Sequence, residues 1–478
     1  MTEPRVAITD GDTHITVTEF EERQRALAGL LREGDIATGD RIAILASNRH
    51  EYLEVTMGAL RSGVIPVPVN PLLKEDEVRY IVEDSGVRWL FTDSPVANPE
   101  GLERTIRFGA DYDALMTDAS PATIARYVLT RPMHYTSGTT GRPKGVYVAP
   151  MNEEEAARRS HSFRQLWGLN DKDVHLVCSP FGHSAPHRFA MRTLESGGRV
   201  IVGGKFEPLD VLSNVSRHRV TSTFMVPTHL ERILRLEPSE LRRHDLSSMR
   251  LLAHAGAPIS EETKLKAMRV FPARSMWEFY GSTEGPATRI SPEEWLSKKG
   301  SVGRASGTAR TRILNEELEE SPVGEVGEVW IEDADAERFS YWGDKAKTEA
   351  AWRGDSYSVG DLGWVDTDGY LYLTGRRHDT IITGGVNVYP QEVELSLLEH
   401  PQIEDAVVFG VVNQEWGQEV RAQVVPVAEH DLDEETVRAW LSRRIATYKC
   451  PRRIEFVRSL QRTATGKLIR TGLDDLYN

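Results

Sequence analysis

Short apolar runs alternate with helix-length segments along the first part of the chain. Apolar runs of strand length occupy 41–45 (RIAIL), 64–69 (VIPVPV) and 87–91, and the segments between them, 51–61 and 74–84, have amphipathic patterns. Parallel strands need long crossover connections, so this alternation predicts α/β units built on a parallel sheet. The prolines of the second run count against a strand there, since proline cannot donate a ladder hydrogen bond.

The same alternation returns in the middle of the chain. Strands are predicted at 174–178, 200–202, 221–226, 251–253 and 276–280, and helices at 208–218 and 261–269. We therefore expect a large N-terminal α/β body of doubly wound sheets. After about residue 285, short runs separated by tight turns predict a small β-rich subdomain, with strands at 327–332 and 370–374. The last 100 or so residues have a pattern of mixed strands and helices, which predicts a compact α+β tail.

Composition and charge narrow the classes of function. The formal net charge is −14, without a long run of like charges, which argues against general nucleic-acid or membrane binding. No apolar stretch reaches the roughly 20 residues of a membrane helix, and the N-terminus lacks an apolar signal core. The two cysteines, Cys178 and Cys450, are far apart and form no disulfide framework, so we expect a cytoplasmic protein.

The segment 135–146, YTSGTTGRPKGV, combines hydroxyls, glycines and one lysine, Lys144. Glycines let backbone N–H groups approach a ligand, hydroxyls add donors, and the lysine adds a positive charge, which together suit a polyphosphate. The segment is not a Walker loop, because counting G-x-x-x-x-G-K from Gly138 places Pro143 where the second glycine belongs. A flexible surface turn is the alternative interpretation, and this density of phosphate-binding residue types favours a phosphate loop.

This segment resembles the phosphate loop of the adenylate-forming superfamily, which includes acyl-CoA synthetases, peptide-synthetase adenylation domains and beetle luciferases. The resemblance continues through HAGAP at 254–258, YGSTEG at 280–285, SVGDLG at 358–363, GRRHDTIITGGVNVYPQEVE at 375–394 and TATGKLIR at 463–470. The motifs follow the family's order across nearly the whole chain and most resemble the acyl-CoA synthetases. The resemblance implies an N-terminal adenylate-forming domain at 1–377 and a small mobile C-terminal domain at 378–478.

The resemblance also assigns roles in adenylation. Glu284 is expected to help hold Mg²⁺, which prefers carboxylate and phosphate oxygens, and the neighbouring Thr283 to contact the phosphate. Asp361 is expected to accept hydrogen bonds from the ribose hydroxyls, and Arg376 to lie near ribose and phosphate, with a surface salt bridge as its alternative role. The other ATP- or AMP-binding residues implied are Thr136, Ser137, Gly138, Thr139, Thr140, Gly141, Gly256, Ala257, Pro258, Glu278, Phe279, Tyr280 and Gly281. Lys144 is grouped with the catalytic residues.

The C-terminal motifs concern the two steps of the reaction. Read alone, Lys467 is a solvated lysine of the tail; by resemblance it enters the active site, where positive charge stabilises the phosphoryl oxygens during carboxylate attack. The family's C-terminal domain swings between two poses, and the best match to its pivot, usually aspartate or lysine, is His378. We favour simple tolerance at this hinge over a pH-sensitive switch. Gly384 and Gly385 would let a pantetheine arm pass close to the backbone.

The segment 179–187, SPFGHSAPH, bears on the identity of the acid. Amino-acid-activating relatives have an aspartate after an aromatic residue here, and none follows Phe181, which argues against α-amino acids. His183 matches a position that lines or gates the acyl pocket in CoA ligases, and Gly281 is expected beside it. His183 and His187 have no evident third ligand, so no transition-metal site is predicted. The segment 111–131 lacks a long apolar insert, which favours an aromatic or short-to-medium acid.

The sequence therefore predicts an AMP-forming acid–thiol ligase that uses ATP, Mg²⁺ and coenzyme A on a non-amino organic acid. One alternative keeps the adenylation but uses a carrier-protein thiol, an amine or a small inorganic nucleophile as acceptor, as relatives in secondary metabolism do. A remoter alternative is a non-catalytic nucleotide-binding module, against which the intact Lys144, Glu284, Asp361 and Lys467 argue. A luciferase-like oxygenase is more remote still. The sequence leaves the oligomeric state open, with a homodimer among the alternatives.

Overall fold

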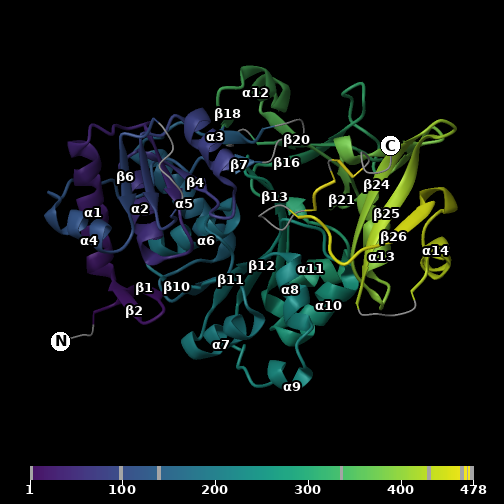
Figure 1. Cartoon of the computed structure of the whole chain (residues 1–478), viewed down its shortest axis with the longest axis horizontal. Coiled ribbons are helices and arrows are strands. Elements are labelled where there is room, and N and C mark those ends of the chain that lie inside the picture. The colour runs from purple at the N-terminus through teal and green to yellow at the C-terminus, as the bar shows by residue number, and fades with distance from the viewer. Residues whose placement is uncertain are drawn as a thin grey trace.

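Two sheets with parallel strands form the body of the protein (Figure 1). The computed structural model describes residues 4–95, 101–136, 142–333, 337–427, 432–462, 468–470 and 472–473. The larger sheet has nine strands in the order β15 (Arg304–Ala305), β14 (Pro286–Ile290), β13 (Met276–Gly281), β12 (Leu251–His254), β11 (Ser222–Met225), β9 (Val174–Val177), β10 (Arg199–Val202), β1 (Val6–Asp10) and β2 (Thr13–Thr16). The strands from β13 to β1 are parallel, and those at both edges are antiparallel.

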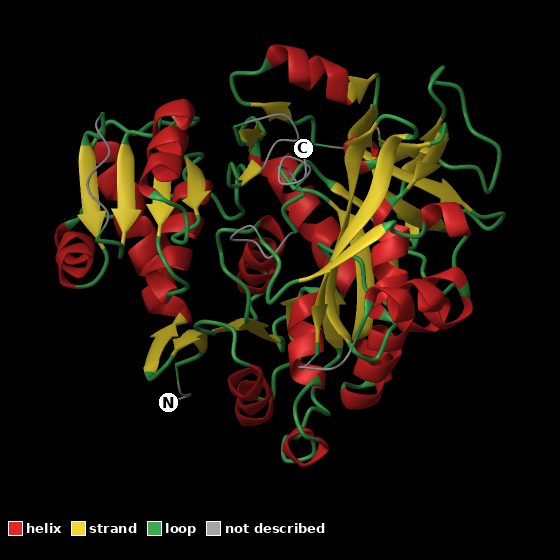
Figure 2. Ribbon diagram, turned by 45° about the vertical axis from the view of Figure 1, so that its right-hand side comes forward, coloured by secondary structure: helices red, strands yellow, loops and turns green. Residues whose placement is uncertain are grey.

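The second sheet has four parallel strands, in the order β4 (Ile65–Val69), β3 (Arg41–Leu45), β5 (Trp89–Thr92) and β6 (Arg104–Arg107). Figure 2 shows it at the left of the molecule. The run with prolines does form a strand, because β4 lies at an edge, where missing N–H donors do not interrupt a ladder. The predicted α/β body is thereby confirmed.

Helices cover these sheets and bury their apolar faces in separate clusters. The helices of the N-terminal part are α1 (Val17–Glu33), α2 (His50–Arg61), α3 (Glu75–Ser85), α4 (Ala110–Asp118), α5 (Glu153–Trp167), α6 (Ser184–Glu195), α7 (Pro208–His218), α8 (Pro227–Leu234), α9 (Pro238–Leu241), α10 (Glu261–Val270), α11 (Pro292–Ser297) and α12 (Lys345–Ala351). Within the described part of the chain, no helix is both long and apolar enough to cross a membrane.

The predicted β-rich subdomain is a five-stranded antiparallel sheet. Its strands are β16 (Arg310–Leu314), β17 (Gly327–Glu332), β20 (Ser356–Val365), β19 (Trp352–Arg353) and β21 (Leu371–Arg376). A smaller sheet is formed by β7 (Tyr135–Thr136), β8 (Lys144–Tyr147) and β18 (Ser340–Tyr341). These two sheets bring the segments that flank the predicted phosphate loop close to the segments near 341 and 361.

The smaller C-terminal domain has a core of its own, formed by residues between Ile381 and Ile454. It contains α13 (Pro390–Leu398), α14 (Glu434–Ser442), β22 (Ile381–Thr383), β23 (Val386–Val388), β24 (Ile403–Asn413), β25 (Gly417–Pro426) and β26 (Arg453–Phe456). Its long strands come forward at the right of Figure 2. The domain contacts the body through an ion pair between Arg235 after α8 and Glu404. The predicted boundary between 377 and 378 stays a prediction.

Candidate active site

The ends of the predicted phosphate loop are held by a short hairpin. Strands β7 and β8 are antiparallel, with Thr136 opposite Lys144. The Lys144 ammonium lies 3.6 Å from Oδ1 of Asp84, and the same carboxylate accepts a 2.8 Å hydrogen bond from the hydroxyl of Tyr135. The predicted loop residues Ser137, Gly138, Thr139, Thr140 and Gly141 lie outside the described residues.

The turn between β13 and β14 carries the predicted magnesium ligand, Glu284. This side chain is largely buried, with 7% of the residue surface exposed. Its Oε1 accepts a 2.8 Å hydrogen bond from the hydroxyl of Tyr341, and its backbone carbonyl accepts one of 3.0 Å from Arg131. The carboxylate is therefore held by one oxygen, while no described group bonds to the other. Thr283 precedes it on the same turn.

Three predicted nucleotide-binding residues meet where the body joins the β-rich subdomain. Asp361 on β20 lies opposite Arg376 on β21, and the Arg376 Nε lies 3.2 Å from Oδ1 of Asp361. From β13, the hydroxyl of Tyr280 donates a 2.6 Å hydrogen bond to Oδ2. Burial, and then the charge of Asp361, raises the pKa of Tyr280 well above its ordinary value, so its hydroxyl stays a donor. The structure brings these three residues together.

The predicted adenine-side residues lie at the ends of two adjacent parallel strands. The segment from Gly256 to Pro258 follows β12, and Phe279 and Tyr280 lie on β13. Gly256 has φ +92°, a left-handed conformation that favours glycine. Ligands of open α/β sheets bind at this carboxyl end of the strands.

Glu278 has a different environment from its neighbours on β13. Its Oε2 accepts a 2.5 Å hydrogen bond from the Lys264 ammonium, and Lys264 is completely buried. The ammonium also lies 4.4 Å from the ring centre of Trp295. The described partners of this carboxylate are Lys264 and His254, and none of its described contacts joins it to Tyr280, Asp361 or Arg376.

The two residues predicted to line the acyl pocket lie on different elements. His183 is the N-cap residue of α6, and Gly281 ends β13. The inner side of α6 contributes Phe189 to an aromatic cluster with Phe224 and Phe279, whose ring centres lie 6.0 to 6.2 Å apart. The space around these strands is therefore filled by large aromatic side chains.

The predicted hinge and thiol-side residues open the C-terminal domain. His378 lies in a short 3₁₀ turn, and its Nε2 is 3.2 Å from Oδ1 of Asp379. Burial, the largest influence, lowers the pKa of His378 below its ordinary value. Gly384 and Gly385 form the turn between β22 and β23 with φ of +58° and +77°, which only glycine adopts readily in succession. The predicted adenylation lysine, Lys467, lies outside the described residues.

Several residues around this site were not predicted from the sequence. Tyr341 and Arg131 bind Glu284, and Lys264 binds Glu278. Two further charged residues, Arg188 and Glu337, lie near them and are considered below. None belongs to a recognised motif, and nothing in the sequence distinguishes Arg188 from the other polar residues of α6.

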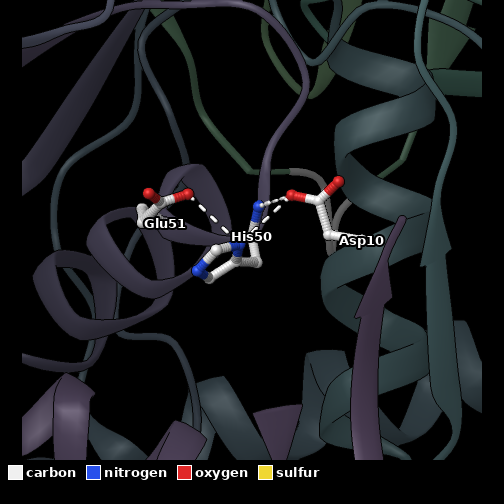
Figure 3. A group of neighbouring side chains, drawn as sticks. All are labelled: Asp10, His50 and Glu51. Carbon is white, nitrogen blue, oxygen red and sulfur yellow. Dashed lines mark hydrogen bonds and ion pairs between the residues drawn. The ribbon is translucent and has the colours of Figure 1, made fainter. Parts of the chain in front are cut away.

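Asp10, His50 and Glu51 form a group with the composition of a metal site (Figure 3). The backbone N–H and ring Nδ1 of His50 lie 3.0 and 3.1 Å from Oδ2 of Asp10. Arg49 binds Glu51 through two hydrogen bonds of 2.5 and 2.8 Å. These contacts already compensate the carboxylates of Asp10, at the end of β1, and of Glu51, at the start of α2, so we assign no cation here.

Comparisons with known proteins agree with this arrangement. The profile of the family described as AMP-binding enzyme matches residues 1–335, and that of the AMP-binding enzyme C-terminal domain matches 392–467. A 2-succinylbenzoate–CoA ligase of Geobacillus kaustophilus is 33% identical, over 100% of this chain and 96% of the relative. A feruloyl-CoA synthase of an Amycolatopsis species is 32% identical, over 97% of this chain and 94% of the relative.

Solved structures of an o-succinylbenzoate CoA synthetase from Bacillus subtilis have the same fold. The complex with its acyl-adenylate intermediate has a TM-score of 0.87 at 28% identity and covers 99% of this chain and 96% of that chain. The complex with ATP and magnesium ion has a TM-score of 0.87 at 29% identity, covering 99% of this chain and 98% of that chain.

Proposed function

The chain belongs to the AMP-binding enzyme family, and we propose that it is an AMP-forming acid–thiol ligase acting in two steps. It activates a non-amino organic carboxylic acid with ATP to an acyl-adenylate, releasing pyrophosphate, and then transfers the acyl group to the thiol of coenzyme A. The relatives named above are CoA ligases that match along nearly their whole length, which supports both steps.

The meeting of Tyr280, Arg376 and Asp361 is the observation that carries this proposal. Asp361 accepts a hydrogen bond from Tyr280 and forms an ion pair with Arg376, and a carboxylate so placed can also accept hydrogen bonds from the two ribose hydroxyls of ATP. Tyr280 and the Gly256 loop lie at the carboxyl ends of the adjacent parallel strands β13 and β12. We assign the ribose to Asp361 and the adenine to the Gly256 and Tyr280 segments on this basis.

Glu284 has the chemistry of a magnesium ligand. One carboxylate oxygen is held by Tyr341, and no described residue occupies the other, so the donor set fits a cation that also binds phosphate oxygens. Bound there, magnesium would offset the negative charge of the phosphates. We assign the phosphate contact to Thr283 on the same turn, which Arg131 fixes through the Glu284 carbonyl.

The remaining positive charge for adenylation is assigned to lysines. The acid carboxylate attacks the α-phosphorus, the bond to the pyrophosphate oxygen breaks, and negative charge develops on the phosphoryl oxygens. We assign Lys144 and the phosphate-loop residues to the departing pyrophosphate, and Lys467 to the phosphoryl oxygens. The C-terminal domain, which we place at 378–478, would deliver Lys467 by rotating at His378.

Coenzyme A is the acceptor that we propose for the second step. The tight turn at Gly384 and Gly385 has no side chain to obstruct a pantetheine arm, and Gly384 packs beside the Trp416 ring, where a Cβ would lie 3.1 Å from a ring carbon. The thiol attacks the acyl carbonyl, and AMP leaves.

A panel of carboxylic acids, scored for pyrophosphate release with and without coenzyme A, tests both steps. We expect acid-dependent pyrophosphate release and an acyl-CoA product. Pyrophosphate release without any acyl-CoA would redirect the second step to a carrier protein, an amine or a small nucleophile. No release with any acid would overturn the adenylation itself. We further propose a cytoplasmic location, in keeping with two free cysteines, and sedimentation would test a homodimer.

A further inference from the structure

Arg188 on α6 lies among other charged side chains. No described residue forms a hydrogen bond or ion pair with it. Surrounding atoms shield it strongly, and burial, followed by repulsion from Arg131, lowers its pKa to about 10. The side chain is nevertheless half-buried rather than sealed from solvent.

Around Arg188, the described positive charges outnumber the carboxylates that could compensate them. Glu337 is shared between Arg131, at 3.2 Å, and Arg159, at 3.4 Å. Arg192, one turn along α6, pairs with Glu195 at 2.5 Å. Each of these neighbouring arginines therefore has a carboxylate partner, whereas Arg188 contributes to the field at Glu337 without bonding to it.

An unpaired charge in such an environment is costly to fold, because the protein replaces little of the hydration that the charge loses. Guanidinium groups in enclosed sites are commonly matched to carboxylates or phosphates, whose planar or tetrahedral oxygens fit the donor fork. The arrangement is thus one that an anionic group of a ligand would complete.

The position of Arg188 connects it to the proposed active site. Its neighbour Arg131 donates to the carbonyl of Glu284. Tyr357, which feels the charge of Arg188, packs so closely against the 281–285 turn that a Cβ on Gly285 would lie 2.5 Å from its hydroxyl. The buried ring of His134 is close enough to both Arg188 and His183 for their charges to affect its pKa. Arg188 is therefore a neighbour of Arg131 and Tyr357, which contact the 281–285 turn, and of His134, which is near His183.

We propose that Arg188, supported by Arg131, binds a second anionic group on the acid substrate, so that the enzyme prefers acids carrying a further carboxylate. This inference rests on the proposed adenylation. The carboxylate that reacts would lie at the α-phosphate, and the second one would pair with Arg188.

The same oxyanion chemistry could come from the polyphosphate of ATP, and the location favours the acid. Arg188 lies on α6, whose N-cap is His183, whereas Lys144 lies on the hairpin that flanks the phosphate loop and contacts Asp84 of α3. The phosphate region therefore has its own lysine, while no other unpaired cation of the described residues has been placed near the acid.

The test compares acids that differ only in the second group: succinate with butyrate, and terephthalate with 4-methylbenzoate. Pyrophosphate release gives kcat/KM for each acid in the wild type, Arg188→Gln, Arg188→Lys and a control, Arg192→Gln. We expect the wild type to prefer the diacid of at least one pair, and Arg188→Gln to reduce that preference by about 10- to 100-fold. Arg188→Lys should restore part of it, and Arg192→Gln should keep it.

Three other results would contradict the role of Arg188, and each can be told apart from the others. A wild type that releases pyrophosphate only with the monoacids keeps the proposed function and removes this one, even if Arg188→Gln fails to fold. An increase in the KM for ATP that is equal for all acids assigns the guanidinium to the polyphosphate. No release with any acid is failure of the proposed function instead.

Discussion

The hydroxyl of Tyr280 donates a 2.6 Å hydrogen bond to Oδ2 of Asp361, which joins β13 of the body to β20 of the β-rich subdomain. Because a ribose would share this carboxylate, Asp361→Asn should raise the KM for ATP by about 10- to 100-fold, the range for losing hydrogen bonds to a charged group. The amide replaces one accepting oxygen by a donor that opposes both hydroxyls. Pyrophosphate release at varied ATP concentration measures the change.

A matched control lies a few residues further along the chain. Asp368, in the exposed turn before β21, forms an ion pair with Lys298 and no contact with Tyr280. Asp368→Asn should therefore leave the KM for ATP unchanged. Equal effects of the two substitutions would contradict the assignment of the ribose to Asp361.

The alternation of apolar runs predicted most of the body. The helix Pro208–His218 and the strands Arg41–Leu45 and Gly327–Glu332 have the predicted bounds, because their patterns are set by local neighbours. The strand Val6–Asp10 was not predicted. Its apolar run spans only Val6 to Ile8, which is too short to indicate a strand, although β1 pairs with β2 directly after it as well as with the distant β10.

The site residues likewise fall into those that the sequence predicted and those that it did not. Asp361, Arg376 and Tyr280 were predicted through motifs, and the structure brings them together. Tyr341 and Arg131, which fix Glu284, come from segments without a motif, and only the folded chain reveals the contacts. Side-chain direction was also beyond reach from the sequence. Glu278 belongs to a predicted nucleotide strand, yet its carboxylate points to Lys264.

Lys467→Ala separates the two proposed half-reactions. The lysine is assigned to the adenylation pose alone, so its loss should abolish acid-dependent pyrophosphate exchange, by about 100-fold or more, since one preorganised donor is worth that much. Thioester formation from supplied acyl-adenylate should continue at nearly the wild-type rate. A single-turnover assay with synthetic acyl-adenylate and coenzyme A measures the second step. Equal loss of both steps would contradict the two-pose mechanism.

For the buried pair of Lys264 and Glu278, we expect removal of one charge to destabilise the fold more than removal of both. Lys264→Met leaves the Glu278 carboxylate buried without a counter-charge, which should cost about 3 to 5 kcal/mol. Lys264→Met combined with Glu278→Leu removes both charges and should recover most of that loss. Thermal unfolding midpoints of the two variants give the comparison.

The same double variant tests the role of Glu278 in nucleotide binding. Its side chain has no described contact with the nucleotide residues, so the KM for ATP should stay within about 3-fold of the wild type, roughly the effect of 0.6 kcal/mol. A much higher KM would show that the carboxylate itself contributes to binding ATP.

His378 at the proposed hinge should not act as a switch at neutral pH. Burial lowers its pKa, despite the opposing charge of Asp379, so the ring is already neutral at pH 7 and stays so as the pH rises. Wild type and His378→Asp should therefore show the same pH dependence of adenylation and of thioester formation between pH 7 and 9. A ratio of the two rates that changes with pH only in the wild type would contradict this expectation.

His50 and Asp10 predict a pH-dependent contribution to stability. Burial by itself would lower the pKa of His50, but the hydrogen bond to Asp10 and the charges of Glu51 and Glu54 raise it above the ordinary value. Despite its own burial, Asp10 has a lowered pKa because of the hydrogen bonds from His50. The protonated ring therefore stabilises the fold fully below the unfolded pKa of about 6.5, and this contribution is lost as the pH rises through the folded pKa.

His50→Gln should consequently cost most between about pH 4, where Asp10 is still ionised, and pH 6.5. We expect about 1 kcal/mol at pH 5.5 and clearly less at pH 9, measured from thermal unfolding midpoints at both values. His161→Gln, at an exposed position of α5, is the control and should show no such difference. A cost for His50→Gln that is the same at both pH values would mean that the ring acts through packing, because a loss of packing does not depend on protonation.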